Sequence, residues 1–477
     1  MKVLLINPPQ VNEILDNTPS IVSEGRGSYP PLGLLYIAAY LEKNAPHHDI
    51  AVLDCQIENS SDSDINKRVR EFDPDIIGIS VMTMTLLDAI NVINICKQTK
   101  QLVKIVLGGP HPHIFPNETI QLEGVDLLVI GEGEITFKEL LDTIENDGDL
   151  QNVQGIVYKR EGKVIHTEPR PLNRNLDVEI PFPARHLVPY KKYSSVLAKR
   201  NPATTMFTSR GCPYKCTFCD RPHLGKIFRF HSSKYVVDEI EHCTKMGINE
   251  FIIYDDTFTI NKQRVKDICN EIIKRNLDVG FDIRARIDTV DEEMLQLLKR
   301  AGCHGVHFGI ESGTAKILKV LNKGIDIDQA KKVIQLTKKY GIPVLTYFII
   351  GNPTETIEDI RETFKVMREL EPDFVHLAIL TPFPSTNIYF SAIEQGIISH
   401  DVWQEFAKNP RKDFIPPYWE EHFTREQLHE LAVEGYKQFY LRPSYILRRL
   451  KKINTWVEFW KNILGGLQIL FLKRRIY

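Results

Sequence analysis

A short loop with three cysteines constrains this chain more than any other feature. Cys212, Cys216 and Cys219 have the spacing C-x3-C-x2-C within Ser-Arg-Gly-Cys-Pro-Tyr-Lys-Cys-Thr-Phe-Cys. Three thiolates on one loop can bind three corners of a cubane iron–sulfur cluster. The fourth iron then has no protein ligand and can bind a small chelating molecule. We therefore expect a [4Fe–4S] cluster that is held by this single loop.

A zinc site is the main alternative, since His223 follows Cys219 by four residues and could supply a fourth ligand. Structural zinc sites usually take four protein ligands from two separated pairs, which this loop does not resemble. The spacing therefore favours the cluster over zinc.

The N-terminus and the hydropathy pattern indicate a cytoplasmic protein. The first apolar run is short and ends at Pro8-Pro9, unlike a signal peptide. No apolar run approaches the ~20 residues that a spanning helix needs. We expect reduced thiols in that compartment, so clustered cysteines indicate metal binding.

The segment around the cysteine loop alternates between strand-like and helix-like patterns. Helical patterns include 233–246 and 263–275, and the cysteine loop directly follows the first strand. Six strand–helix units predict a partial (β/α)6 barrel over 201–385, with its chemistry at the carboxyl ends of the strands. The expected strands are 204–208, 250–254, 279–283, 305–309, 344–350 and 374–380.

Residues 1–145 show a separate alternation, which predicts an α/β domain with a Rossmann-like parallel sheet. A chain of 477 residues has room for several such domains. We expect a Pro-rich connector over 146–200 with a hairpin near 155–165, and a mainly helical region over 386–477. The expected strands of the first domain are 3–6, 50–53, 76–80, 104–107 and 126–130, with helices such as 34–42 and 85–97.

The cysteine loop, with Phe218 before its last cysteine, closely resembles that of the radical S-adenosylmethionine (SAM) enzymes. The resemblance covers about residues 200–390. In that family the open iron binds the amino and carboxylate groups of SAM, and reduction yields methionine and a 5′-deoxyadenosyl radical. The resemblance implies that Phe218 lies at the SAM site, and that a reductant such as flavodoxin or ferredoxin is a partner.

Polar residues at the next two strand ends match positions of the same family. Asp255 and Asp256 resemble the acidic strand end that receives the ammonium group of SAM, although either could instead cap a helix. Arg286 resembles the arginine that pairs with the SAM carboxylate, and we prefer it to Arg284. The period-two pattern does not decide which face the two arginines share.

Two later strand ends complete the expected SAM site. Glu311 resembles the carboxylate that accepts hydrogen bonds from the ribose hydroxyls. Gly351, in Ile-Gly-Asn-Pro-Thr-Glu, resembles the adenine-binding turn, where glycine lets the backbone approach a flat base.

The first domain resembles the cobalamin-binding domain that precedes many radical SAM barrels. That subgroup includes the anaerobic magnesium-protoporphyrin ester cyclase and many methyltransferases. The segments that carry the resemblance are Pro-Pro-Leu-Gly, Gly-Gly-Pro-His and Gly-Glu-Gly-Glu. The implied cobalamin contacts are Pro31, Gly33, Ser80, Gly108, Gly109, His111, Gly131, Glu132 and Gly133.

One departure from the cobalamin domains concerns the cobalt ligand. The motif D-x-H-x-x-G, whose histidine binds cobalt from below, is absent. His111 and His113 could be cobalt ligands, but we expect their Gly-Pro-rich loop to pack around the corrin. A Rossmann-like module that has lost its ligand is the alternative, since the dinucleotide motif G-x-G-x-x-G is absent as well.

Together these resemblances imply an enzyme that removes hydrogen from an unactivated carbon and methylates that carbon with the help of cobalamin. Oxidative cyclisation or rearrangement by the same cofactors is an alternative, and a non-enzymatic iron–sulfur or cobalamin sensor is another. Methylthiolation would need a second cysteine trio, but the first 200 residues contain only Cys55 and Cys96. We expect a small-molecule or lipid-like substrate. A net charge of −2 gives no indication of nucleic acid binding.

The C-terminal tail is basic, because residues 441–477 contain nine Lys and Arg but one Glu. Apolar residues recur there at helical spacing. A basic amphipathic helix at 445–475 could lie peripherally on the inner face of the membrane, or it could dock on the protein. The apolar positions are Ile446, Leu450, Ile453, Val457, Trp460 and Leu464.

Overall fold

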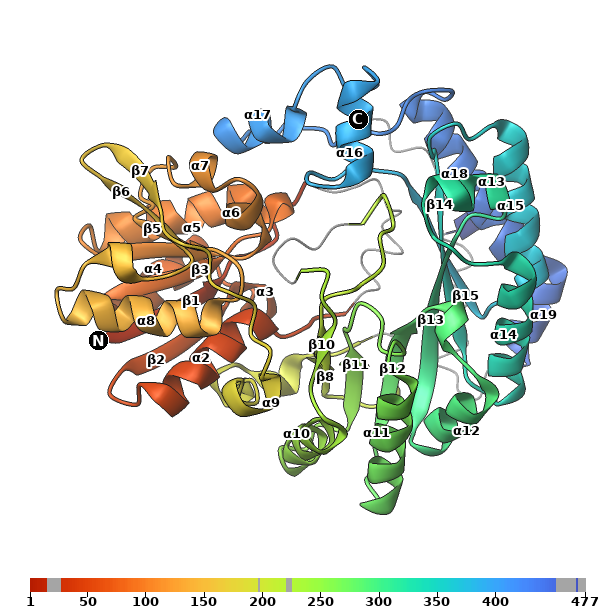
Figure 1. The fold of residues 1–477 in the computed structure, drawn as a ribbon, viewed down its shortest axis with the longest axis horizontal. Helices are drawn as coiled ribbons and strands as arrows, with labels where there is room; N and C mark the ends of the chain where they lie inside the picture. The colour runs from red at the N-terminus through yellow and green to blue at the C-terminus, as the bar shows by residue number, and fades with distance from the viewer. Residues whose placement is uncertain (15–26, 196–197, 220–224, 452–468, 471–477) are drawn as a thin grey trace.

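The computed structural model describes residues 1–14, 27–195, 198–219, 225–451 and 469–470. His223 and most of the basic tail lie outside these ranges. The chain forms two large sheets, each built around parallel strands, together with a helical C-terminal region (Figure 1).

The five parallel strands predicted for the first domain are present. They pair in the order β2-β1-β3-β4-β5. Along β1, Val3 and Leu5 belong to one buried cluster while Leu4 and Ile6 belong to another, so both faces of the sheet are covered. The strands are β1 (Lys2–Asn7), β2 (Asp49–Asp54), β3 (Ile76–Ser80), β4 (Lys104–Gly108) and β5 (Leu127–Val129).

Helices from both sides bury the two faces of this sheet. One face is covered by α2 (Leu32–Asn44) and α8 (Gly133–Glu145), and the other by α4 (Asp62–Phe72) and α5 (Leu86–Thr99). The carboxyl ends of β1, β3, β4 and β5 are left free to bind ligands, as is usual in such sheets.

The hairpin expected in the connector extends the first sheet. Its strands β6 (Ile156–Arg160) and β7 (Lys163–His166) are antiparallel, and β6 pairs with β5. The sheet therefore has seven strands, with the hairpin beside the end of β5.

The second sheet is the predicted partial barrel, with all six strands parallel. Its outer face is buried under helices α10 (Ser233–Lys245), α11 (Lys262–Lys274), α12 (Glu292–Arg300), α14 (Ile327–Lys339) and α15 (Ile357–Leu370). The strands, in spatial order, are β8 (Ala203–Met206), β11 (Glu250–Ile253), β12 (Gly280–Ala285), β13 (Cys303–Glu311), β14 (Val344–Ile350) and β15 (Phe374–Ile379).

The outer edge of β15 is closed by α18 (Arg425–Tyr440). The hydroxyl of Tyr436 accepts from the amide of Leu377 and donates to its carbonyl, at 3.0 Å each. Tyr440 does the same for Val375, at 2.9 and 2.8 Å. Tyrosine hydroxyls thus satisfy an edge that would otherwise present unpaired backbone groups.

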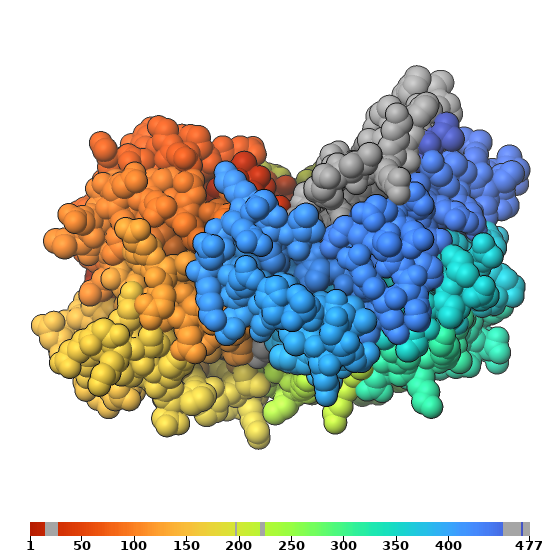
Figure 2. Space-filling model, turned by 90° about the horizontal axis from the view of Figure 1, so that it is seen from above, coloured from red at the N-terminus to blue at the C-terminus, as the bar shows by residue number. Residues whose placement is uncertain are grey.

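The C-terminal region is helical, as predicted, and it bridges the two sheets. Between them lie α16 (Asn387–Glu394) and α17 (Val402–Lys408), as Figure 2 shows from above. Gln404 of α17 donates a hydrogen bond of 2.9 Å to Glu118 of α7 (Pro116–Thr119) in the first domain. The last named helix within the described residues is α19 (Pro443–Leu450). None of the helices in the described ranges is long and apolar enough to cross a membrane.

Candidate cofactor and active site

The cysteine loop is held in place by residues from distant parts of the chain. Thr217 donates from its amide to the carbonyl of Leu321 at 3.0 Å and accepts from the amide of Ile388 at 3.0 Å. Asn322 donates to the carbonyl of Lys215 at 2.8 Å. The loop between β13 and α14 and the start of α16 therefore fix its backbone.

None of the three cysteines of this loop is in a disulfide, and none is fully buried. Cys212 and Cys216 are half-buried and Cys219 is exposed. Burial raises the pKa of the Cys216 thiol, while nearby Lys323 and Arg286 oppose that rise. Cations beside a thiol favour the thiolate, the form that binds iron. The donor set fits a [4Fe–4S] cluster; His223, the fourth ligand of the zinc alternative, lies outside the described residues.

Asp255 acts on the backbone that leads into the loop. One carboxylate oxygen accepts from the amides of Thr208 and Ser209, at 2.6 and 3.0 Å. The other accepts from their two hydroxyls, at 2.5 and 2.6 Å. The side chain is fully buried. These four bonds show that Asp255 positions the backbone at this strand end. The neighbouring Asp256 is half-buried as a residue, with both of its carboxylate oxygens buried.

Arg286 lies directly against the cysteine loop. Its guanidinium stacks on the ring of Tyr214, 3.7 Å from the centroid. It also forms a two-pronged contact with Asp288, at 2.9 and 3.1 Å, and donates to the carbonyl of Lys323 at 2.8 Å. The arginine is thus close to the expected cluster, but much of its hydrogen-bonding capacity is already used.

Lys323 was not predicted as a site residue, yet it links several that were. Its ammonium is buried and lies 2.6 Å from Glu311, and it lies 6.0 Å from the ring centroid of Phe218. Glu311 ends β13 with a positive φ of 71°, which turns the chain at that strand end. The carboxylate keeps further acceptor sites for ribose hydroxyls. Lys323 follows α13 (Ala315–Val320), outside any motif, so no sequence signal marked it.

The turn after β14 is built as expected, with a packing role for its glycine. Gly351 has a φ of 76°, and a Cβ there would lie 3.0 Å from Leu428 of α18. The carboxylate of Glu355 accepts from the amide of Asn352 at 2.9 Å, and burial raises its pKa to about 7. Helix packing therefore requires glycine at 351 independently of any bound base.

A cavity of about 270 Å³ lies between the first sheet and helices α2 and α8. It is lined by backbone and side chains from the ends of β3, β4 and β5, and by Phe207 and Arg210, which lie between β8 and the cysteine loop. Seven of the nine residues expected to contact cobalamin line this cavity, namely Gly33, Ser80, Gly108, Gly109, Gly131, Glu132 and Gly133.

Glycines keep this cavity open. No heavy atom lies within 4 Å of the position that a Cβ would occupy at Gly33 or Gly131, and at Gly108 only a carbonyl oxygen at 3.8 Å does. Side chains at these points would fill the space. A slot of this kind fits a flat group inserted from the carboxyl edge of the sheet, so the residues present fit a cobalamin tail.

Pro31 and His111 do not line the cavity. His111 is fully buried, 3.1 Å from the hydroxyl of Thr83, and its ring packs against Phe115. Burial lowers its pKa to about 3. His111 is therefore a neutral histidine of the core. Its contacts with Thr83 and Phe115 explain its presence, and no bond to cobalt is needed.

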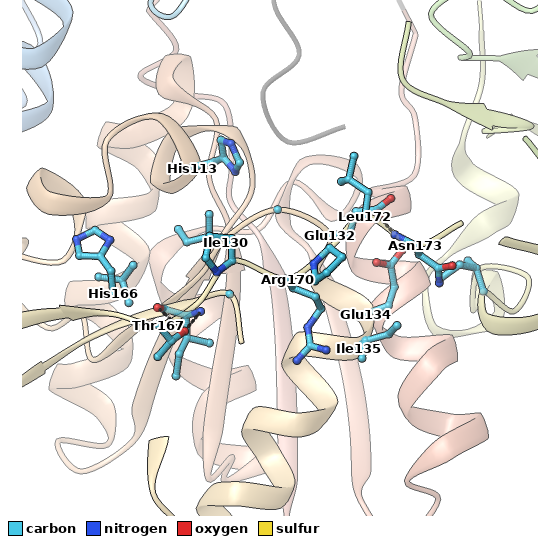
Figure 3. Close-up of a pocket in the computed structure, with 17 residues that line it drawn as sticks. His113, Ile130, Glu132, Glu134, Ile135, His166, Thr167, Arg170, Leu172 and Asn173 are labelled. Carbon is cyan, nitrogen blue, oxygen red and sulfur yellow. Dashed lines mark hydrogen bonds between the residues drawn. The ribbon is translucent and has the colours of Figure 1, made fainter. Parts of the chain in front are cut away.

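A second cavity, of about 350 Å³, lies on the other side of the Gly131–Glu134 segment. Figure 3 shows His113 and His166 at one side of it and Glu132, Leu172 and Asn173 at the other. The hairpin β6–β7 and the connector after it form its remaining walls. The two cavities share Gly131, Glu132 and Glu134 as a common wall.

A buried charge network connects this wall to the cysteine loop. Arg210, two residues before Cys212, lies 2.8 Å from Glu132 and 2.6 Å from Glu134. Arg229 contacts both oxygens of Glu132, at 2.9 and 2.8 Å. Burial acts to raise the pKa of Glu132, but the two guanidinium groups outweigh it and hold that pKa below its usual range.

Comparisons with known proteins agree with this geometry. Residues 206–367 match the model of the radical SAM superfamily, and residues 20–141 match that of the B12 binding domain. The chain is 37% identical to an uncharacterized methyltransferase of Pyrococcus horikoshii, over 94% of both chains. It is 30% identical to the anaerobic magnesium-protoporphyrin IX monomethyl ester cyclase of Rubrivivax gelatinosus, over 94% of this chain and 78% of that protein.

Solved structures share the fold. The cobalamin-dependent S-adenosylmethionine radical enzyme OxsB, with aqua-cobalamin and S-adenosylmethionine bound, superposes with a TM-score of 0.76. The match covers 99% of this chain and 72% of that chain, at 20% identity.

Proposed function

The chain belongs to the radical SAM enzymes that carry a B12-binding domain, and from this premise we propose that it methylates an unactivated carbon of a small-molecule substrate. It is an enzyme whose cofactors are a [4Fe–4S] cluster, SAM and cobalamin. The observation that carries the proposal is the glycine-lined cavity of the first sheet, whose wall is bonded to the residues that precede the cysteine loop.

Each cofactor has a proposed set of residues. Cys212, Cys216 and Cys219 would hold the cluster, and the residues that line the 270 Å³ cavity would hold cobalamin. Phe218, Asp256, Arg286, Glu311 and Gly351 would surround SAM, with Asp255 and Lys323 positioning them. When bound, the cluster and SAM supply a carbon-centred radical and cobalamin supplies a methyl group.

The chain's own residues orient these groups and shield them from water. Arg286 and Lys323 place two cations beside the cysteine loop, where they offset negative charge on thiolates and sulfides. Helices α16 and α17 cover the space between the two sheets, which limits access of solvent to the reacting groups (Figure 2).

Oxidative cyclisation is the second candidate, because a cyclase is among the relatives at 30% identity. The two reactions differ in what happens to SAM. Methylation needs one SAM to recharge cobalamin and another for the radical, so it releases S-adenosylhomocysteine as well as 5′-deoxyadenosine. Cyclisation needs only the second of these.

The test uses anaerobic holoenzyme with cobalamin, SAM and a strong reductant. We expect 5′-deoxyadenosine together with S-adenosylhomocysteine, the latter close to one equivalent per cobalamin even without substrate. Deoxyadenosine alone would favour cyclisation. Absence of deoxyadenosine from cluster-loaded protein would favour a sensor.

We also propose that the C-terminal segment makes peripheral contact with an anionic membrane. Most of 445–475 lies outside the described residues, but α19 exposes Ile446, Leu447 and Leu450 by 43%, 60% and 47%. Three exposed apolar side chains on one short helix, followed by a basic sequence, suit a membrane surface. Co-sedimentation with phosphatidylserine vesicles, lost in 150–500 mM salt or on truncation after residue 440, would support this contact.

A further inference from the structure

The inner face of the barrel is accessible and polar below the proposed SAM site. In β14, Leu345, Tyr347 and Ile349 are half-buried while the residues between them are buried under helices. The pattern repeats in β15, where Phe374, His376 and Ala378 face inward. A packed eight-stranded barrel would fill this lumen with apolar side chains. In this six-stranded sheet the inward residues of β14 and β15 are only half-buried.

Four neighbouring strands and the residue that follows β11 each contribute one polar side chain to a belt across this face, which we call the lumen belt. It consists of Tyr254, Arg284, His307, Tyr347 and His376. The guanidinium of Arg284 stacks on Tyr254, 3.8 Å from the ring centroid, and Arg284 is paired in register with His307. His307 lies 2.9 Å from the hydroxyl of Tyr347, whose ring is 5.6 Å from that of His376.

Arg284 is the permanently charged member of the belt. Burial lowers the pKa of His307 to about 3, with Arg284 adding to the effect, so His307 is neutral. Within the described residues, Arg284 donates one hydrogen bond, to the carbonyl of Ile253 at 3.1 Å, and forms no ion pair. A guanidinium has five N–H donors, so most of its donors remain available.

The two arginines of the segment Arg-Ala-Arg thus differ in the contacts that their side chains make. Arg286 already holds Asp288 with two contacts and stacks on the cysteine loop. Arg284 lies two strand residues deeper, roughly 7 Å further from the carboxyl end of the sheet. The cysteine loop lies at that end, so Arg284 would lie deeper in the barrel than SAM bound to a cluster on the loop.

We infer that the lumen belt recognises the substrate, and that Arg284 binds an oxyanion of it, either a carboxylate or a phosphate-type group. This inference rests on the proposed function, since it concerns the substrate of the same site. Asp282, two residues earlier, is close enough for its charge to interact with that of Arg284, but no carboxylate among the described residues lies within ion-pair distance of the guanidinium. A half-buried arginine of this kind is best stabilised by an anionic ligand that takes two parallel N–H bonds. The tyrosines and His307 supply hydrogen-bonding groups on either side.

The belt also gives the substrate a direction. Ile349 and Ala378 are register partners that lie between the belt and the strand ends that carry the proposed SAM residues. A substrate whose anionic end contacts Arg284 would pass these two apolar side chains and present a carbon toward the cofactors. An uncharged lipid would leave Arg284 unpaired, so the belt selects against that class.

Calorimetric titration of anaerobic holoenzyme tests this inference with two probes, methylphosphonate and succinate. We expect at least one probe to bind the wild type in the millimolar range, and the tighter one indicates the class of oxyanion. Arg284→Gln should weaken that binding at least tenfold, and Arg284→Lys should weaken it by less. Arg361→Gln, which removes an exposed arginine of α15, is the matched control and should change it less than twofold.

A second readout separates substrate recognition from SAM recognition. The Arg284→Gln variant should bind SAM and form 5′-deoxyadenosine within threefold of the wild type. The inference is overturned if neither probe binds the wild type, if Arg284→Gln binds the probe unchanged, or if it loses SAM binding. Should Arg284→Gln fail to fold, Arg284→Lys carries the same comparison. Failure of the proposed function would instead appear as absence of deoxyadenosine from the wild type.

Discussion

Arg210, two residues before Cys212, donates a hydrogen bond of 2.8 Å to Glu132 on the wall of the proposed cobalamin cavity. Glu132 lies between β5 and α8 of the first domain, whereas Arg210 lies between β8 and the cysteine loop. Their side chains are nearly buried, at 10% and 7% exposure. The contact joins the backbone that leads into one proposed cofactor site to the wall of the other. Glu134 extends the contact at 2.6 Å, and Tyr36 lies under the guanidinium at 5.2 Å.

We therefore predict that Arg210→Gln destabilises the protein by about 3–5 kcal/mol, since it removes the cation beside the buried Glu134 and leaves Glu132 with Arg229. The thermal midpoint and the affinity for cobalamin should both fall. Glu134→Gln in the same chain should restore part of the loss, which a double-mutant cycle would measure as coupling. The control is Arg160→Gln, which breaks an exposed pair with Asp149. Purely additive losses would argue against the coupling.

Lys323 is expected to set the affinity for SAM through Glu311. Lys323→Met keeps the length of the side chain but removes the cation that lies 2.6 Å from the Glu311 carboxylate. We predict that SAM binds roughly tenfold more weakly, a loss of about 1.4 kcal/mol of binding free energy. Lys319→Met, on the exposed surface of α13, should leave SAM affinity unchanged. Unaltered binding in the Lys323 variant would show that this lysine does not position the site.

Much of the fold could be predicted from the sequence because buried parallel strands form short apolar runs. The strands around Val3, Ile76 and Val344 are examples, and each was expected within a few residues of its bounds. Local runs do not report which distant strands pair. The hairpin β6–β7 was expected in the connector, but its place at the edge of the first sheet depends on pairing with β5.

The site was predictable only where a motif lies at a strand end. Gly131 and Gly33 line the expected cavity because glycine patterns mark open backbone. His111 lies in the expected loop, but its side chain is buried in the core. The direction of a single side chain in a loop depends on the backbone conformation, which the motif does not indicate. Lys323 follows no motif, and the partners of Arg210 lie about 80 residues earlier in the chain, where no local pattern indicates them.

Gly33 offers a direct test of the cavity. It lies in the first turn of α2 at an ordinary helical φ, and the space beyond its missing Cβ is open. Gly33→Leu should fill the cavity and abolish corrin binding. Leucine has a higher helix propensity than glycine, which should stabilise the apoprotein by up to about 1 kcal/mol. Its thermal midpoint should therefore stay the same or rise. Corrin binding that survives this substitution would place cobalamin elsewhere; Gly33→Ala is the milder control.

Asp282 should make stability depend on pH. It lies below the lumen belt with 1% exposure, and burial raises its pKa from 3.8 to about 6. The folded state therefore holds the proton more tightly than the unfolded state. The resulting stabilisation is complete below pH 4 and is lost as the pH rises through 6, by about 3 kcal/mol.

Asp282→Asn removes this titration. Relative to the wild type, its urea midpoint should rise between pH 4.5 and 7.5. A difference between the two proteins that stays constant over this range would contradict the prediction.

The central claim is that one chain holds an iron–sulfur cluster and cobalamin in two separate sites. The absorption spectrum of anaerobically purified protein, expressed with cobalamin, tests it most directly in three forms. We predict both sets of bands in the wild type, corrin bands alone in the Cys212/Cys216/Cys219→Ala variant, and cluster bands alone in Gly33→Leu. A wild type without corrin bands, or loss of both chromophores in either variant, would contradict it.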